Sequence, residues 1–510
     1  MITYSRYIDK LFPYLLGFTA FLLSDVAQGQ VKKPLNDLNY DIEVGGAFAG
    51  NRQTPFWLRT NQYGIVPTES NFYTLRAGLN RDYVNHSDSA TAKKRKRFDW
   101  GVTANGVFNG IPSRTDKTKE FLWPEVYAKL KFGAFELYGG KRRELVGLGD
   151  STLSSGFMAW SGNAMPFPKI QFQTIDFVPL KFIKSILSFK ASYAHGWFTV
   201  PYIQGAYLHQ KSLYARFGKP HWRVRFYAGL NHQVQWGGKA DYLIGSPVAE
   251  NGELPANFRD YMSLVTGRYP DDYSNDRFNS FDGANRIGNH LGSYDFALEW
   301  DDTKRTILFY HQHPYEDASG LAFQNFPDGL TGLRILRKPN SSKNSFQLRR
   351  LVMEFLQTTD QSGATYVTLA RYQGTDSYFN HGQYKEGWSY FGNTIGTPFI
   401  APRTTLQAGV IPASSTNFFP NNRVLMGYLG SEWTIFKKVS LLSRSSFSRN
   451  FGLYGEAFTP PLNQFSFLLS ASVPVAKWSG FSVKGSVALD QGQLLPGSIG
   501  GFISLKKTWQ

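Results

Sequence analysis

The sequence of 510 residues contains no cysteine. Disulfide bonds are therefore excluded, and so is an N-terminal lipid anchor that is attached through a thiol. After residue 29, no stretch approaches the roughly 18 consecutive apolar residues that a membrane-spanning helix needs. Acidic residues are fewer than basic ones, 38 against 55, and the formal net charge is +17. This excess favours anionic partners, namely phosphorylated lipids, acidic polysaccharide or nucleic acid.

Aromatic residues and glycine are abundant instead. The chain has 42 Phe, 28 Tyr, 12 Trp and 49 Gly. Many rings and glycines without long apolar runs are typical of numerous half-apolar strands joined by turns. Such a composition also excludes a disordered chain.

The first residues have the pattern of an export signal. Arg6 and Lys10 precede an apolar stretch over 11–23, and small residues at Ala27 and Gly29 precede a cleavage point before Gln30. The apolar stretch is too short for a spanning anchor. We therefore expect residues 1–29 to be a signal peptide and 30–510 to form the mature protein.

Apolar and polar residues alternate through the mature sequence. In "HWRVRFYAGLNHQVQW" the residues Trp222, Val224 and Phe226 alternate with Arg223, Arg225 and Tyr227. "QFSFLLSASV" and "FSVKGSVAL" repeat the pattern, which puts apolar side chains on one face of a strand. The strands are long for a globular sheet, and they suit a tilted membrane crossing. In a membrane barrel their charged faces line the lumen, whereas in a sandwich they face water.

The connections between the expected strands alternate in length. Even-numbered connections are mostly tight, and include Gly133, 218–220, 301–304, "TDQSG" around Asp360, and 436–438; odd-numbered ones are long, and cover 51–71, 141–169, 237–291, 315–343 and 374–421. A soluble sandwich has no reason to sort its loops in this way. The pattern predicts an all-β, antiparallel, transmembrane outer-membrane barrel of about 18 strands, with short periplasmic turns and long extracellular loops.

Two further segments of this barrel are informative, one at the C-terminus and one in a short connection. "GGFISLKKTWQ" ends the chain with alternating apolar residues and with Trp509, and we interpret this as the signal that the barrel-insertion machinery reads. The basic run from Lys93 to Arg97 falls on the expected periplasmic side, where a charge run is usually a solvated turn.

Signatures of catalysis and metal binding are weak. Gly149-Asp150-Ser151 resembles an esterase nucleophile block, but no Asp-x-x-His supplies a base, which favours a glycine-rich turn. His311 and His313 share a strand face without a third ligand, and the acidic loop 270–283 lacks calcium-loop spacing. No recognition helix concentrates the positive charge, which argues against nucleic acid. We expect no enzyme activity, no metal and no cofactor.

Four blocks of sequence resemble one known family. They are "TPFWLRTNQYGIVP" (54–67), "GGKRRELVGLGDSTLSSGFMAWSGNAMPFPKI" (139–170), "YHQHPYEDASGLAFQNFPDGLTGL" (310–333) and "NHGQYKEGWSYFGNTIGTPF" (380–399). In this order they are similar to the capsule assembly Wzi family, in its Bacteroidetes branch. The resemblance implies an outer-membrane barrel whose lumen is plugged by its own loops and that acts as a surface lectin. Its partners would be capsular or other surface polysaccharide, and the lipids of the outer membrane, including lipopolysaccharide.

The fourth block has the chemistry that sugars require. Pyranose rings stack their C–H faces on aromatic rings, while amides supply both donors and acceptors to the hydroxyl groups. Arginine matches uronic acid carboxylates with two parallel hydrogen bonds. The candidate polysaccharide-binding residues are Asn380, His381, Tyr384, Trp388, Tyr390 and Asn393 in this block, with Arg142, Arg143, Trp160 and Asn163 in the second block.

Other interpretations of these residues stay open. Aromatic residues in barrel loops often only pack a plug, so each ring either contacts ligand or fills the lumen. The alternative function is a porin or oligosaccharide channel whose basic lumen favours anionic solutes. A surface hydrolase that uses Asp150 or Glu316 is a third interpretation.

Overall fold

The computed structural model describes residues 38–83, 97–112, 120–268, 286–338, 345–367, 372, 374–476 and 478–509. The expected signal peptide, the acidic loop 270–283 and the basic residues 93–96 lie outside these ranges.

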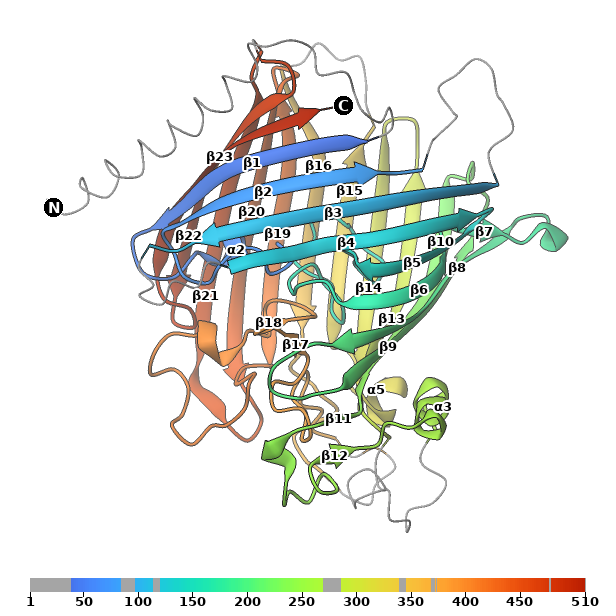
Figure 1. The fold of residues 1–510 in the computed structure, drawn as a ribbon, viewed down its shortest axis with the longest axis vertical. Coiled ribbons are helices and arrows are strands. Elements are labelled where there is room, and N and C mark those ends of the chain that lie inside the picture. Colours follow the sequence, from blue (N-terminus) through green and yellow to red (C-terminus); the bar gives the residue numbers. More distant parts are fainter. Residues whose placement is uncertain are drawn as a thin grey trace, which may run out of the picture. The chain divides into compact units, whose positions relative to one another are not determined.

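The described chain forms one antiparallel sheet that closes on itself (Figure 1). Its nineteen strands are β1 (Asn39–Ala49), β2 (Phe72–Arg81), β3 (Phe98–Gly110), β4 (Glu120–Phe132), β5 (Phe135–Lys141), β6 (Pro168–Thr174), β7 (Val178–Pro179), β8 (Leu187–Phe198), β9 (Ala206–Phe217), β10 (Val224–Trp236), β13 (Asn289–Asp301), β14 (Arg305–Tyr315), β15 (Gly329–Arg337), β16 (Phe346–Gln357), β19 (Val424–Ile435), β20 (Val439–Gly452), β21 (Ala457–Pro474), β22 (Phe481–Gly492) and β23 (Ser498–Trp509).

The barrel is closed by the pairing of its first strand, β1, with its last strand, β23. In this pairing Tyr40 lies opposite Trp509. β6 and β7 both pair with β8 and form one interrupted wall strand, so the described barrel has eighteen wall strands. This confirms the predicted fold and strand number. No helix among the described residues is long and apolar enough to span a membrane.

The alternation seen in the sequence sorts side chains between the two faces of the wall. On β10, Val224 and Phe226 point outward and are 52% and 44% exposed. Arg225 between them points inward, is 8% exposed and donates to Glu299 on β13 at 2.8 Å. An apolar outer belt and a polar, ion-paired interior are what a barrel in a lipid bilayer requires.

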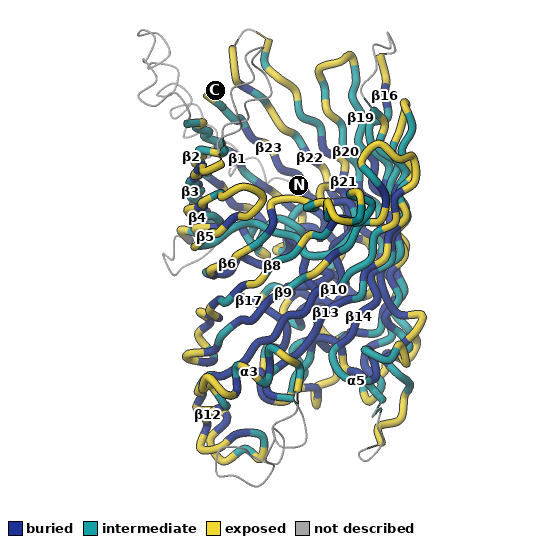
Figure 2. Tube along the Cα trace, turned by 90° about the vertical axis from the view of Figure 1, so that its right-hand side faces the viewer, coloured by how far each residue is buried: buried dark blue, intermediate teal, exposed yellow. Residues whose placement is uncertain are grey.

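The two ends of the barrel differ as predicted. Tight turns at 133–134, 302–304 and 436–438 lie at the end where β1 begins and β23 ends. The long connections 50–71, 142–167, 237–288 and 358–423 leave the wall at the other end. The described parts of 237–288, with β11, β12 and α3, lie at the lower end in Figure 1. Figure 2 shows that buried positions are concentrated in the half nearer the long loops. By the rule for outer-membrane barrels, the loop end is extracellular.

One predicted hairpin is wrong. The segment "TDQSG" does form a turn, in which the amide of Gly363 donates to the carbonyl of Asp360 at 2.9 Å. The turn does not join two wall strands, because it begins the long loop 358–423. Asp328 holds it by accepting from the amides of Asp360 and Gln361 at 3.0 and 2.8 Å. The wall strand that the sequence analysis did not predict is β15, which lies inside the predicted loop 315–343.

Two of the long loops fold into the barrel and anchor on its inner wall. In loop 50–71, Trp57 donates its indole N–H to Ser446 on β20 at 3.0 Å. In loop 142–167, the amide of Ser155 donates to Glu354 on β16 at 2.6 Å, and Tyr428 on β19 donates to the carbonyl of Leu153 at 2.6 Å. The two loops, which we call the plug, bury the main hydrophobic core of the molecule together with loop 358–423.

Short helices and two-stranded pairs lie in the connections between wall strands. They are α2 (Phe56–Arg59), α3 (Phe258–Thr266), α5 (Ala318–Leu321), the short 3-10 turns η3 (Lys181–Ile183), η4 (Asp241–Leu243) and η5 (Arg403–Thr405), and the two-stranded pairs β11 (Gly238–Lys239) with β12 (Glu253–Leu254) and β17 (Ser389–Tyr390) with β18 (Asn393–Thr394).

Candidate functional site

Residues 374–423, which we call the cap, carry the aromatic-rich segment. Its three candidate aromatic residues are almost completely buried: Trp388 and Tyr390 are 0% exposed and Tyr384 is 1% exposed. The hydroxyl or indole N–H group of each of these side chains is hydrogen-bonded. Tyr384 donates to the carbonyl of Gly237 at 3.1 Å, and the Tyr390 hydroxyl lies 2.6 Å from the hydroxyl of Thr199. These side chains fix the cap to other loops and do not face solvent.

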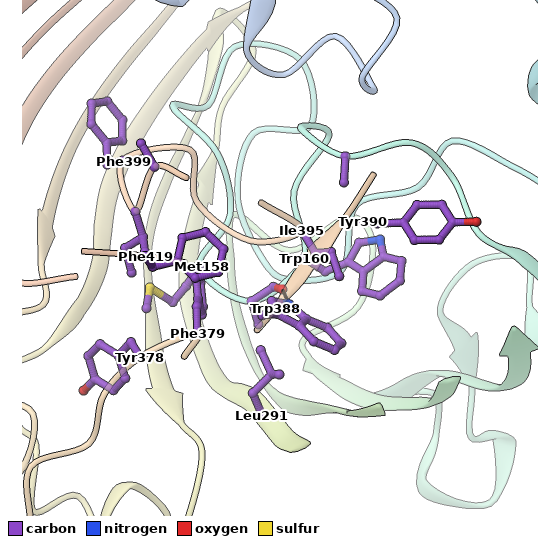
Figure 3. Close-up of a cluster of buried hydrophobic side chains, with 14 of the residues drawn as sticks. Met158, Trp160, Leu291, Tyr378, Phe379, Trp388, Tyr390, Ile395, Phe399 and Phe419 are labelled. Atoms are coloured by element: carbon purple, nitrogen blue, oxygen red, sulfur yellow. Dashed lines mark hydrogen bonds between the residues drawn. The ribbon is translucent and has the colours of Figure 1, made fainter. Parts of the chain in front are cut away.

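The plug and the cap meet in one aromatic cluster (Figure 3). Trp160 of the plug lies edge-on to Trp388, with ring centroids 6.1 Å apart, and Tyr390 stacks on Phe167 at 3.9 Å. Trp388 also donates its indole N–H to the carbonyl of Ala159 at 2.9 Å. The sequence candidates Trp160, Trp388 and Tyr390 are thus brought together, but as a packed core.

The amide candidates are also used internally. Asn380 donates to the carbonyl of Phe419 at 2.9 Å and accepts from the Phe419 amide at 3.1 Å, which ties two ends of the cap together. Asn163, in the plug, donates to the carbonyl of Thr394 at 3.0 Å. Because these amides satisfy backbone groups, they supply rigidity rather than free donors.

His381 lies beside the Tyr384 ring, at a centroid distance of 5.3 Å. Its Nδ1 accepts from the amide of Gln383 at 3.2 Å. Burial lowers the pKa of His381 to about 4, so the ring is neutral at neutral pH. A neutral His381 supports the fold of the cap and carries no charge for an anionic sugar.

The two arginine candidates lie inside the barrel and are ion-paired. Arg142 donates to Glu136, a 2% exposed carboxylate on the inner face of β5, and its guanidinium lies 5.1 Å from the Tyr138 ring. Arg143 lies 3.5 Å from a carboxylate oxygen of Glu125. Neither arginine is placed as an extracellular sugar contact would be. Arg142 lines a cavity of about 10 Å³ together with Trp160.

The outward face of the cap presents other residues. β17 and β18 form a hairpin whose two turn residues, Phe391 and Gly392, have φ of +46° and +73°. Positive φ at both central positions defines a type I′ turn, which normally takes Asn-Gly. Phe391 occupies this unfavourable position and is 49% exposed. An exposed ring held on such a hairpin is a candidate for ligand contact.

Asn393 follows directly on this turn and is the candidate that lies beside an exposed ring. Its Nδ2 donates to the carbonyl of Phe391 at 3.3 Å, in an exposed position. Sequence analysis selected Asn393 and missed Phe391. The available signal was "YFGN", in which a bulky residue precedes glycine where Asn-Gly is usual.

A second exposed aromatic patch lies between the cap and loop 237–288. Tyr242 is 37% exposed and donates to the carbonyl of Gln383 at 2.9 Å. The ammonium group of Lys385 lies 4.8 Å from the Tyr242 ring and 5.8 Å from the Tyr202 ring. A flat ring beside a cation is suited to a sugar with an acidic group.

The weak catalytic and metal signatures have structural explanations. Asp150 accepts from the amides of Leu153 and Thr152 at 2.6 and 2.9 Å and pairs with Arg350 at 3.0 Å, which makes it a turn and anchor residue. His311 is 2.8 Å from the hydroxyl of Thr331. Within the described ranges, no group of three or more His, Asp or Glu side chains is arranged to hold a metal ion.

Comparison with known proteins decides the family. The family described as capsule assembly protein Wzi matches residues 38–426, which is most of the chain. The protein belongs to the capsule assembly Wzi family. It is an outer-membrane β-barrel, and the resemblance seen in the four sequence blocks is confirmed.

The fold of one solved structure agrees with this assignment. Wzi of Escherichia coli, described as a carbohydrate-binding β-barrel involved in group 1 capsule assembly, matches with a TM-score of 0.56 at 14% identity, over 92% of this chain and 84% of that chain. OpdK of Pseudomonas aeruginosa with vanillate matches at 0.45 and 9% identity, over 93% and 99% of the two chains. No curated protein sequence matches the chain.

Proposed function

We propose that this member of the Wzi family is a non-enzymatic lectin. It binds capsular polysaccharide on its extracellular cap and helps to assemble and retain the capsule. The hairpin tip supports this most directly, because Phe391 exposes a ring at φ +46° next to the amide of Asn393. The Escherichia coli relative is described as a carbohydrate-binding β-barrel, which also supports this proposal.

The proposed site has two levels. Phe391 and Asn393 contact the sugar, and Tyr242 with Lys385 extends the surface. Trp160, Asn163, Asn380, His381, Tyr384, Trp388 and Tyr390 form the rigid base. A preorganised base matters because a weak ligand such as a pyranose ring cannot also supply the free energy to order a loop. Arg142 and Arg143 keep the base of the plug in place from inside the barrel.

The porin alternative is less well supported. Both plug loops reach the inner wall, through Trp57 to β20 and through Ser155 to β16. A chain anchored across the lumen obstructs the path of a solute.

The proposal is tested in cells of the producing bacterium. We expect Phe391→Ala to lower the amount of cell-bound capsule several-fold, while the released polymer rises and the barrel content of the outer membrane is unchanged. The matched control is Phe326→Ala, which removes a 65% exposed ring from a different extracellular loop. Equal capsule retention in both variants would refute the assignment of Phe391.

A further inference from the structure

Helix α3 (Phe258–Thr266) packs on the outside of the barrel wall. On β9 the outward-facing residues Leu213 and Phe217 are each 54% exposed and belong to the lipid-facing belt. The next outward positions towards the loop end are Lys211 and His209, and His209 is covered. Tyr261 of α3 covers it, with ring centroids 5.7 Å apart. The helix therefore lies directly above the lipid belt.

The contact between α3 and the belt is continuous. The hydroxyl of Tyr261 lies 2.8 Å from that of Tyr193, which is 42% exposed in the outward row of β8. The Tyr261 ring also lies 5.3 Å from the ring of Trp236, and Leu264 is 0% exposed in the same small core. Since Tyr and Trp on an outer wall mark the membrane interface, α3 lies at the level of the outer leaflet.

Both ends of α3 are fixed. At its start, Asn257 accepts from the amide of Asp260 at 2.9 Å, and Asp260 accepts from the amide of Asn257 at 3.0 Å, which completes a capping box. At its end, Lys211 donates to the carbonyl of Val265 and Arg286 donates to that of Gly267 at 2.8 Å. Two cations at the negative end of the helix dipole stabilise this docking.

The other face of α3 is apolar and exposed. Phe258 is 78% exposed and Met262, one turn later, is 47% exposed. Arg259 and Arg268 on the same segment are also exposed. A helix that packs one face on a membrane barrel and presents Phe, Met and Arg on the other has the composition of an interfacial lipid contact.

We propose that α3 is a binding site for lipopolysaccharide of the outer leaflet, through its lipid A portion. Phe258 and Met262 contact acyl chains, and the cationic residues Arg259 and Arg268 pair with the lipid A phosphates, beside Lys211 and Arg286 at the end of the helix. Three observations favour this occupant: α3 continues the lipid-facing belt, it lies at the loop end of the barrel, and its exposed charges are positive. Guanidinium groups match phosphate oxygens with two parallel bonds.

The site differs from the proposed sugar site. Phe391 and Asn393 lie on a hairpin of the cap, whereas α3 belongs to loop 237–288 and docks on β8, β9 and β10. Anchoring α3 in lipopolysaccharide would hold the barrel at the surface where capsule is organised. Loss of one site should leave ligand binding at the other intact.

The test uses the whole protein in lipid nanodiscs or mild detergent, with purified lipid A as probe. We expect the intact barrel to retain lipid A in native mass spectra and to prefer it over phosphatidylglycerol by at least about tenfold. Phe258→Ser with Met262→Ser should weaken lipid A binding by about tenfold, since two apolar side chains lose their contact. Arg259→Ala with Arg268→Ala should weaken it similarly and reduce its salt dependence.

Three controls make the result decisive. Phe326→Ser changes a 65% exposed ring elsewhere in the extracellular loops and should leave lipid A binding unchanged. Heat-modifiable migration in gel electrophoresis shows that each variant is folded, and polysaccharide binding should persist in the α3 variants. Equal retention of lipid A and phosphatidylglycerol, or unchanged binding in both double variants, would overturn the proposal.

Discussion

Trp388 donates its indole N–H to the carbonyl oxygen of Ala159 at 2.9 Å, although the two residues lie 229 positions apart in the chain. The bond joins the cap to the plug at the centre of the aromatic cluster, where Trp388 is 0% exposed. The cap therefore rests on residues of the plug that lies inside the barrel.

Trp388→Ala should destabilise the cap by about 3–5 kcal/mol, because it removes a buried ring and leaves a cavity. Trp388→Phe keeps most of the packing and loses the bond to Ala159, at a cost of about 1–3 kcal/mol. Limited proteolysis of the cap in intact cells measures both effects. A wild-type cleavage pattern in Trp388→Ala would show that the cap does not depend on this cluster.

The lumen should be closed to ions. Because the plug loops anchor on β16 and β20, the purified protein in a planar bilayer is expected to show no steady conductance. Replacing residues 147–164 by a short Gly-Ser linker should produce open-pore currents. Steady currents in the unaltered protein would instead support the porin interpretation.

The stability of the cap should depend on pH through Asp376. This 8% exposed carboxylate accepts from Ser362 at 2.7 Å and from Ser319, within α5, at 2.9 Å. Burial, and then the negative charge of Asp317, raises the pKa of Asp376 from 3.8 to about 7. A raised pKa stabilises the folded cap fully below about pH 4, and this contribution is lost as the pH rises through about 7.

The cap should therefore unfold at a lower temperature at pH 8 than at pH 5, as followed by tryptophan fluorescence. Asp376→Asn, which resembles the protonated acid, should flatten this dependence. Asp241→Asn, which removes an exposed loop carboxylate, should leave it in place. An unchanged pH profile in Asp376→Asn would show that another group controls the cap.

The fold could be predicted from the sequence because the lipid bilayer imposes a simple pattern. Outward residues such as Val224 and Phe226 must be apolar, and short turns must fall on one side. The pattern failed where a strand has weak alternation. β15 reads "GLTGLRILR", with two glycines and a short length, whereas residues 364–367 after the Asp360 turn look like a strand and are not one. One strand was missed and one was wrongly added, so the predicted number of strands is still correct.

The site was harder to predict than the fold. Sequence alone shows that the segment 380–399 is rich in aromatic residues and amides, and the structure shows that most of them face inward. Burial of Tyr384, Trp388 and Tyr390 depends on loops 50–71 and 142–167, which no local pattern places beside the cap. The pairing of Arg142 with Glu136 likewise depends on which face of β5 is inward. Only the turn at Phe391 could be recognised from the local sequence, because "YFGN" has a bulky residue before glycine.

The direct binding of polysaccharide tests the central claim. Purified capsular polysaccharide of the producing bacterium is titrated against the barrel in nanodiscs, with intact protein, Phe391→Ala, Asn393→Ala and Phe326→Ala. We expect saturable binding to the intact protein and to Phe326→Ala, and about tenfold or greater weakening in the two hairpin variants, because a stacked ring or a lost amide bond is worth about 1–2 kcal/mol. The absence of binding to the intact protein, or equal affinity in all four, would contradict the account.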